Sequence, residues 1–166
     1  MKNLLAIVAS LMLAACAGYS GADLKPGVVT EAEVLQTMGR PAMTWDLPGG
    51  GRQLAYPRGP AGFQTYMVFI DAAGRMERNI NVMNMDTFAK VQAGMTQAQV
   101  LQLLGPSQPE WTAYFKARDE LVWEWRYCDS WNSAARFDVL FDATTKIVRS
   151  TQTWTEDQKS SFHISC

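Results

Sequence analysis

The sequence predicts an α+β protein made of two tandem units, each a short helix followed by a three- or four-stranded antiparallel sheet. A capped helix motif occurs twice, at residues 30–39 and 96–105. A second landmark, Phe-Ile-Asp-Ala at residues 69–72, reappears as Leu-Phe-Asp-Ala at residues 140–143. Landmarks that return in the same order after about 70 residues indicate a duplicated supersecondary unit. Strand-like alternation of apolar and polar residues follows each motif.

The amino-terminal segment has the features of a bacterial lipoprotein signal. A lysine at position 2 precedes an apolar run of about a dozen residues, which is too short to span a bilayer but suits a signal-peptide core. The run ends in Leu-Ala-Ala-Cys, residues 13–16, which resembles a lipobox. We therefore expect residues 1–15 to be removed and Cys16 to carry the lipid anchor, with acyl chains such as palmitate. The alternative is an ordinary signal peptide cleaved near residue 15.

The compartment is predicted from the residues around this cysteine. Ala17, rather than an aspartate, follows Cys16, which resembles the address of an outer-membrane lipoprotein facing the periplasm. Acyl carbons stabilise such anchoring by about 0.8 kcal/mol each when buried. Residues 16–24 are small and polar, and we expect a tether there. The net charge of -1, with both signs scattered, offers no electrostatic case for nucleic acid or an anionic lipid surface as a partner.

Both predicted helices are marked by their ends. A threonine followed three residues later by Glu or Gln is a capping box, and a glycine closes each helix in a left-handed conformation. Helices of about two turns are too short to be stable alone in water, so each must pack on a sheet. The capping residues are Thr30 with Glu33 and Thr96 with Gln99, and the closing glycines are Gly39 and Gly105.

The first unit is predicted over residues 25–84. After its helix, residues 45–56 form a hairpin around a turn rich in proline and glycine. Residues 64–71 alternate with apolar side chains on both faces, so this strand is expected to be central or covered on its second face. Residues 75–82 return as the next strand.

The second unit is predicted over residues 85–166. A helix over residues 85–91, entered through Asp86, precedes the capped helix. The strands follow, and one sheet face is aromatic while the other carries interleaved charges. This pattern is typical of an antiparallel sheet with helices on one side. The predicted strands are a hairpin over residues 111–115 and 120–127, then residues 136–141 and 147–154.

Two sets of side chains on these strands invite functional interpretation. Trp123, Trp125 and Tyr127 could form a ligand platform, but their alternation with charged residues favours core. The charged set could suggest acid–base chemistry, although cross-strand charge pairs on a solvated sheet face are far commoner. We retain the charged set as the candidate partner-binding residues: Glu124, Arg126, Arg136 and Asp138.

The remaining cysteines are candidates for a disulfide. Cys128 and Cys166 would lie in a compartment that oxidises cysteine pairs, and a bridge would attach the C-terminal tail to a strand. The alternative is two unpaired thiols, one buried and one at a frayed end.

The sequence supports no catalytic or metal centre. An enzyme should show a nucleophile with a base, a metal-ligand cluster or a phosphate-binding loop. The only histidine, His163, lies near the end of the chain without an activating motif. The glycines at 49–51 precede a strand rather than a helix, and the cysteines lack zinc-site spacing. We expect no enzyme activity, no cofactor and no metal.

The second copy resembles the SmpA/OmlA family of outer-membrane lipoproteins, which includes the BamE-like proteins. The resemblance is carried by Gly-Met-Thr-x-x-x-Val-x-x-Leu-Leu-Gly at residues 94–105, by Trp123 and Trp125, and by Phe-Asp-Val-Leu-Phe-Asp at residues 137–142. It extends more loosely to residues 30–39 and 69–71 of the first copy. It implies an α+β fold at the periplasmic face of the outer membrane, with the barrel assembly machinery as one candidate partner.

The tandem arrangement resembles a second architecture. The familiar assembly-machinery member of that family has a single unit, whereas two units in series look like the β-lactamase inhibitor protein. The two repeats of that inhibitor make one continuous concave sheet that grips another protein.

Three functions are consistent with the sequence. The leading hypothesis is a non-enzymatic lipoprotein that binds another envelope protein, in support of outer-membrane protein assembly or envelope integrity. The second is an inhibitor or sensor that clamps a periplasmic enzyme on the open sheet face, which exposed aromatic residues there would favour. The third is a carrier of a small lipid or peptide, which predicts an enclosed apolar pocket of several hundred Å³ between the units.

Overall fold

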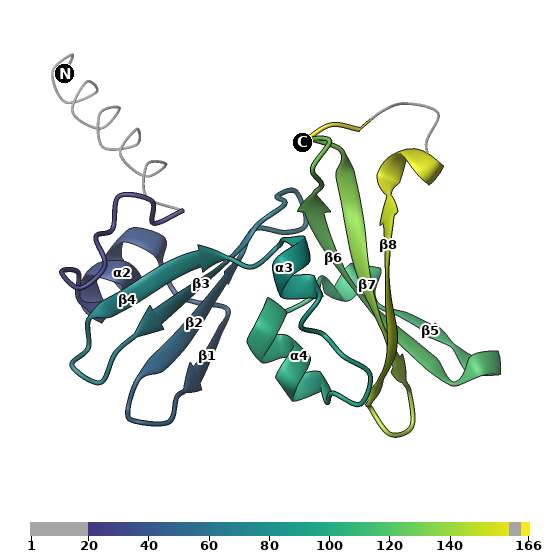
Figure 1. Ribbon diagram of the computed structural model, residues 1–166, viewed down its shortest axis with the longest axis horizontal. Helices are drawn as coiled ribbons and strands as arrows, with labels where there is room; N and C mark the ends of the chain where they lie inside the picture. Colours follow the sequence, from purple (N-terminus) through teal and green to yellow (C-terminus); the bar gives the residue numbers. More distant parts are fainter. Residues whose placement is uncertain (1–19, 160–163) are drawn as a thin grey trace, which may run out of the picture.

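The computed structural model describes residues 20–159 and 164–166. Two four-stranded antiparallel sheets, β1-β2-β3-β4 and β5-β6-β7-β8, follow one another along the chain, each in chain order (Figure 1). This confirms the α+β class and the two-unit arrangement. The helices and strands are α2 (Glu31–Met38), β1 (Met43–Asp46), β2 (Arg52–Pro57), β3 (Thr65–Ile70), β4 (Met76–Asn81), α3 (Met85–Phe88), α4 (Gln97–Leu104), η2 (Pro109–Trp111), β5 (Ala113–Phe115), η3 (Lys116–Arg118), β6 (Glu120–Cys128), β7 (Ala134–Asp142), β8 (Val148–Thr155) and η4 (Glu156–Lys159).

Several sequence predictions fall outside the described residues. These are the signal peptide over residues 1–15, the lipid anchor at Cys16, part of the tether, and His163. Within residues 20–159 and 164–166, no helix is long and apolar enough to cross a membrane.

Helix α2 covers one face of the first sheet. Its capping box is formed, with the Thr30 side chain accepting from the Glu33 backbone and the Glu33 carboxylate accepting from the Thr30 N–H. The helix buries Val34 and Met38 against the sheet, and Gly39 ends it at a φ of 81° that few other residues adopt. Their partners in this cluster are Leu54, Tyr56, Val68, Ile70 and Met76.

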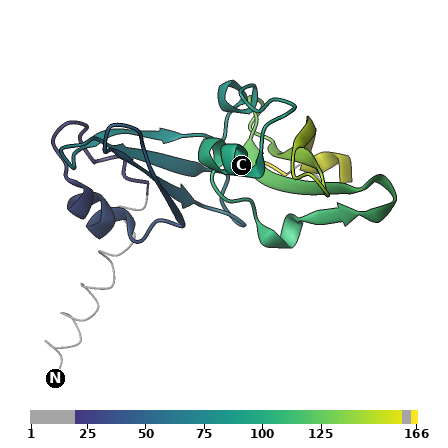
Figure 2. The same ribbon diagram turned by 90° about the horizontal axis from the view of Figure 1, so that it is seen from below.

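Helix α4 covers the opposite face of the first sheet as well as the inner face of the second. Its Val100 and Leu104 are fully buried in a cluster that includes Met67 of β3 and Phe141 of β7. The teal helices α3 and α4 accordingly lie between the two sheets (Figures 1 and 2). Strand β3 is therefore both central in its sheet and buried on both faces, as its alternation predicts.

The aromatic face of the second sheet is core, as predicted. Trp125 and Tyr127 are buried. Phe88 of α3 stacks on Phe137 with ring centroids 4.1 Å apart and meets Tyr127 edge-on at 4.9 Å. The Trp125 indole N–H also donates to the carbonyl of Gly105, at 3.2 Å, where α4 ends.

The two units repeat one another in backbone detail. Each capping threonine forms an isolated bridge to its own sheet, Thr30 to Arg75 and Thr96 to Ile147. The residue before each threonine accepts a 2.8 Å hydrogen bond from a strand N–H, Met76 in the first unit and Val148 in the second. A register shift interrupts both third strands near their ends, at Phe69/Ile70 and at Leu140/Phe141.

Some local predictions differ from the structure. The helix expected over residues 85–91 has only the four residues of α3, and its cap is Asn84 rather than Asp86, because the Asn84 side chain accepts from Thr87 N. Trp111 lies in the short helix η2, and β5 begins only at Ala113. The two sheets are not joined by strand pairing, so the continuous sheet of the inhibitor architecture is not formed by the described strands.

Candidate functional site

The charged set of the second sheet lies on its outer face, away from α3 and α4. The strand register places Glu124 directly opposite Asp138, and Arg126 directly opposite Arg136. Like charges therefore face each other, and the cross-strand charge pairing expected from the sequence does not form between directly opposed residues. Opposite charges meet diagonally instead, as in the 2.7 Å ion pair of Arg136 with Glu124.

Glu156 connects the two opposed arginines. Its carboxylate accepts two 2.7 Å hydrogen bonds from Arg126 and one of 2.5 Å from Arg136. Only 10% of its side chain is exposed, against 17% for Arg126 and 13% for Arg136. Burial raises the pKa of Glu156, but the hydrogen bonds and charges of the two arginines outweigh it and hold that pKa below its ordinary value. The face is thus an ordered network, not the solvated surface that was expected.

Aromatic rings also pack against the same two arginines. The Arg126 guanidinium carbon lies 4.2 Å from the centre of the Phe63 ring, and that of Arg136 lies 3.7 Å from the Trp111 ring. These are cation–π distances. Arg126 also donates to the carbonyl of Ala61 at 3.3 Å, so the loop after β2 contacts the second sheet.

Asp138 is the most buried member of the charged set, with 4% of its surface exposed. Its Oδ2 accepts from the Gln152 amide at 2.8 Å and from the Trp154 indole at 3.0 Å. Its Oδ1 is buried and accepts no hydrogen bond within the described part of the chain.

A groove of about 720 Å³ runs along this outer face. Its lining includes the carboxylates of Glu124 and Asp138 and the aromatic residues Trp111, Phe115 and Trp154. Phe115 is 44% exposed on the edge strand β5. The face therefore presents aromatic surface as well as charge.

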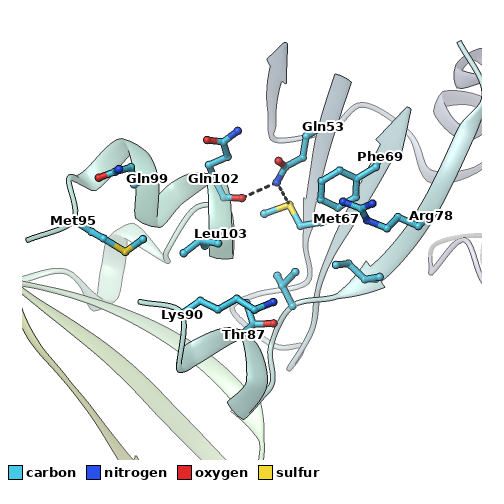
Figure 3. Close-up of a pocket in the computed structure, with 12 residues that line it drawn as sticks. Gln53, Met67, Phe69, Arg78, Thr87, Lys90, Met95, Gln99, Gln102 and Leu103 are labelled. Atoms are coloured by element: carbon cyan, nitrogen blue, oxygen red, sulfur yellow. Dashed lines mark hydrogen bonds between the residues drawn. The ribbon is translucent and has the colours of Figure 1, made fainter. Parts of the chain in front are cut away.

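A second hollow, of about 390 Å³, lies between the first sheet and the helices α3 and α4 (Figure 3). The first sheet contributes residues from β2, β3 and β4, and the second unit contributes residues from α3, α4 and the segment between them. The lining residues are Gln53, Met67, Phe69, Arg78, Ile80, Val82, Thr87, Lys90, Met95, Gln99, Gln102 and Leu103.

Gln53 links the two units by a hydrogen bond at this pocket. Its side chain is 3% exposed, and its amide nitrogen donates to the carbonyl of Gln102 in α4, at 2.6 Å, and to the sulfur of Met67, at 3.4 Å (Figure 3). A buried polar group without a partner would be costly, so this hydrogen bond fixes where α4 sits on the sheet.

The cysteines predicted to pair lie close enough to do so. The Cα atoms of Cys128 and Cys166 are 5.9 Å apart, a separation usual for a disulfide. The tail also pairs with the sheet, because the backbone N–H of Ala134 donates to the carbonyl of Ile164 at 2.8 Å. Trp131, 84% exposed, stands at the hairpin tip beside them.

Sequence reasoning missed Glu156, and it offered a pocket between the units only as what a carrier function would require, without the residues that line it. The alternation of β8 could have revealed Glu156, because Gln152, Trp154 and Glu156 follow at period two and the first two face Asp138 and Arg136. The pocket has no comparable signal, since its walls come from segments far apart in the chain. Among residues 20–159 and 164–166, no cluster of His, Cys, Asp and Glu has the arrangement of a metal site.

The described residues thus define an α+β protein of two packed units, with a groove on one sheet and a pocket between the units. No protein-family model matches the chain. No curated protein matches it. Among solved structures, an extracellular protein of Bacillus anthracis containing an SCP domain is similar, with a TM-score of 0.32 and 10% identity, over 86% of this chain and 47% of that one. This chain spans about half the length of that protein, and a similarity this weak carries no functional argument.

Proposed function

We propose that the protein is a non-enzymatic lipoprotein, anchored through Cys16 at the periplasmic face of the outer membrane, that binds another envelope protein. The proposed role is support of outer-membrane protein assembly or envelope integrity. The lipobox-like residues 13–16 and the resemblance to the SmpA/OmlA family support the location. The outer face of the second sheet supports the binding activity.

The observation that carries the proposal is the combination of aromatic residues lining the groove with an ordered charge network beside it. Aromatic residues and arginine are enriched where proteins bind one another, and the residues that matter most lie in well-packed patches. Here Trp111 and Trp154 flank the network of Arg136 and Glu156. Side chains already held in place lose little conformational entropy when a partner binds.

The test is site-specific photocrosslinking in intact cells. A photoreactive phenylalanine analogue at Phe115 faces the groove, whereas one at Tyr114 lies on the opposite face of the same strand and is 58% exposed. We expect a crosslinked envelope protein from position 115 and not from position 114. Equal or absent crosslinking at the two positions, with a normal envelope after gene deletion, would contradict the proposal.

The anchor is tested separately. Changing Cys16 to alanine should move the protein from the membrane fraction to the soluble fraction, because the acyl chains that hold it to the bilayer cannot be attached. Unchanged membrane association would refute the lipid anchor. It would not affect the proposed partner binding at the groove, which the crosslinking experiment tests.

A second candidate function is favoured by Phe115. Exposed aromatic surface on the open sheet face is what an inhibitor or sensor of a periplasmic enzyme would present. This second function would be supported if an enzyme is crosslinked at position 115 and the purified protein lowers the activity of that enzyme.

A further inference from the structure

We infer that the pocket between the two units binds a small amphipathic anion, a single alkyl or acyl chain that ends in a carboxylate or phosphate. This site is separate from the groove, and the inference does not depend on the proposed function.

The pocket has the size and position of a ligand site. Its volume of about 390 Å³ lies within the range of about 300–1,000 Å³ that is usual for small-molecule sites. It is open to solvent, so a chain can enter. Neither unit forms it alone, because Phe69 and Met67 belong to the first sheet and Leu103 belongs to α4.

The lining is suited to a flexible apolar chain. Met67 and Val82 are fully or almost fully buried and form the inner wall, and Met95 and Leu103 are partly buried opposite them. Methionine side chains adapt to irregular apolar shapes. Ile80 is 40% exposed, and an apolar ligand would remove its surface from water.

The charges of the lining select for an anion. Lys90 and Arg78 extend toward the pocket from opposite sides (Figure 3), and the lining contains no carboxylate. Lys90 forms no ion pair with any described residue. Arg78 lies over the Phe69 ring, 3.8 Å from its centre, and its ion-pair partner Glu77 is 57% exposed. An exposed pair of this kind is weak, so the guanidinium remains available for a stronger anion.

The two cations and the apolar wall together define the ligand. A carboxylate or phosphate at the mouth can accept charge-assisted hydrogen bonds from Lys90 and Arg78. The attached chain can then lie along Phe69 and Leu103 without burying a polar group. A neutral chain gains only the apolar contacts, and a cationic head is repelled.

The experiment measures binding of chain-matched probes to the purified protein by calorimetry, below their micellar concentrations. The probes are dodecanoate, dodecyl phosphate, dodecanol and dodecyltrimethylammonium. We expect both anions to bind, dodecanol to bind about tenfold more weakly, and the cation not to bind. The ratio of the two anions distinguishes a fatty acid from a phosphate ester as the preferred ligand.

Variants locate the site. Lys90→Gln and Arg78→Gln should each weaken the binding of dodecanoate about three- to tenfold and leave the binding of dodecanol unchanged. Lys116→Gln, which removes the same charge from η3 outside the pocket, should change neither. Ile80→Trp should fill the mouth of the pocket and abolish binding of all the probes. Because residue 80 is partly exposed, the variant should still fold, and circular dichroism checks this.

Three results would overturn the inference. These are absence of dodecanoate binding, equal binding of dodecanoate and the trimethylammonium probe, and dodecanoate binding that survives both Ile80→Trp and the loss of Lys90 and Arg78.

Discussion

At the scale of single residues, the outer face of the second sheet depends on how opposed like charges are compensated. Arg126 and Arg136 stand directly across from each other, and like charges in that register destabilise a sheet. Glu156 bonds to both, so one carboxylate relieves the repulsion and orders both guanidinium groups. Glu156 is therefore the common partner of both arginines.

Removal of the Glu156 carboxylate should lower the stability of the folded protein. Glu156→Gln removes the carboxylate that the two opposed, partly buried arginines share and leaves Arg136 with Glu124 alone, so we expect the free energy of unfolding to fall by about 3 kcal/mol. Urea denaturation followed by tryptophan fluorescence measures it. The matched control is Glu77→Gln, which breaks the exposed pair with Arg78 and should cost under about 1 kcal/mol. Equal effects of the two changes would contradict the role given to Glu156.

The same carboxylate makes stability depend on pH. Because the pKa of Glu156 in the folded protein lies below its ordinary value of 4.5, the unfolded chain binds the proton first as pH falls. Its contribution is complete above about pH 4.5 and is lost as pH falls through the lowered folded pKa. Asp142 also contributes to the loss of stability below pH 3.8. Its pKa is lowered to about 2, mainly by the hydrogen bond from the Thr145 backbone N–H and next by Arg149.

We therefore expect the free energy of unfolding to decline as pH is lowered from about 4.5 toward about 2. Urea denaturation across this range measures the slope, and the slope should be shallower in Glu156→Gln. An identical slope in the variant would show that Glu156 does not titrate in this way.

The residues of the charged face were predictable only in part. Alternation placed Glu124, Arg126, Arg136 and Asp138 on one face, because side chains in a strand alternate with period two. It could not give their partners, because the register and the course of the chain after β8 decide which charges meet. Burial of Asp138 likewise follows from Gln152 and Trp154 on the neighbouring strand.

At the scale of elements, the hairpin of β6 and β7 is joined to the chain's end. Cys128 closes β6, and Cys166 lies next to the residue that bridges back to Ser133. A bridge across a separation of 38 residues would stabilise the fold chiefly by restricting the unfolded chain.

Replacement of both cysteines by serine should therefore lower the free energy of unfolding by up to about 4 kcal/mol. Chemical denaturation measures this, with the single Cys16→Ala change as the control that leaves the pair intact. Mass spectrometry of the oxidised wild-type protein should show Cys128 and Cys166 linked. Two free thiols in that sample would overturn the predicted pairing.

The two capped helices were predictable to the residue, whereas α3 was not. A capping box and a closing glycine are local signals, and both helices begin and end where those signals place them. Helix α3 has four residues and is held mainly by Phe88 against the second sheet. Asn84 and Asp86 can both cap a helix, and tertiary packing decides between them.

At the scale of the whole molecule, the two units share one core. Met67 of the first sheet, Val100 of α4 and Phe137 of the second sheet belong to the same buried cluster. Separation of the units would expose apolar surface on both, so we expect them to unfold together.

Met67→Ala tests this coupling. Met67 is fully buried, and its truncation should lower the free energy of unfolding by about 3 kcal/mol. Tryptophan fluorescence, which reports mostly on the second unit, and circular dichroism should shift together to the same midpoint. A fluorescence transition unchanged from wild type would show that the second unit folds independently of the first.

The sequence by itself determined the two-unit α+β class, the two capped helices, and the faces of the central strands. These follow from short-range signals, since caps and alternation act over a few residues. The tertiary structure alone decided that α4 lies between two separate sheets, that Glu156 joins opposed arginines, and that a pocket opens between the units. Each of those features brings together segments far apart in the chain, and their meeting depends on the packing of one shared core.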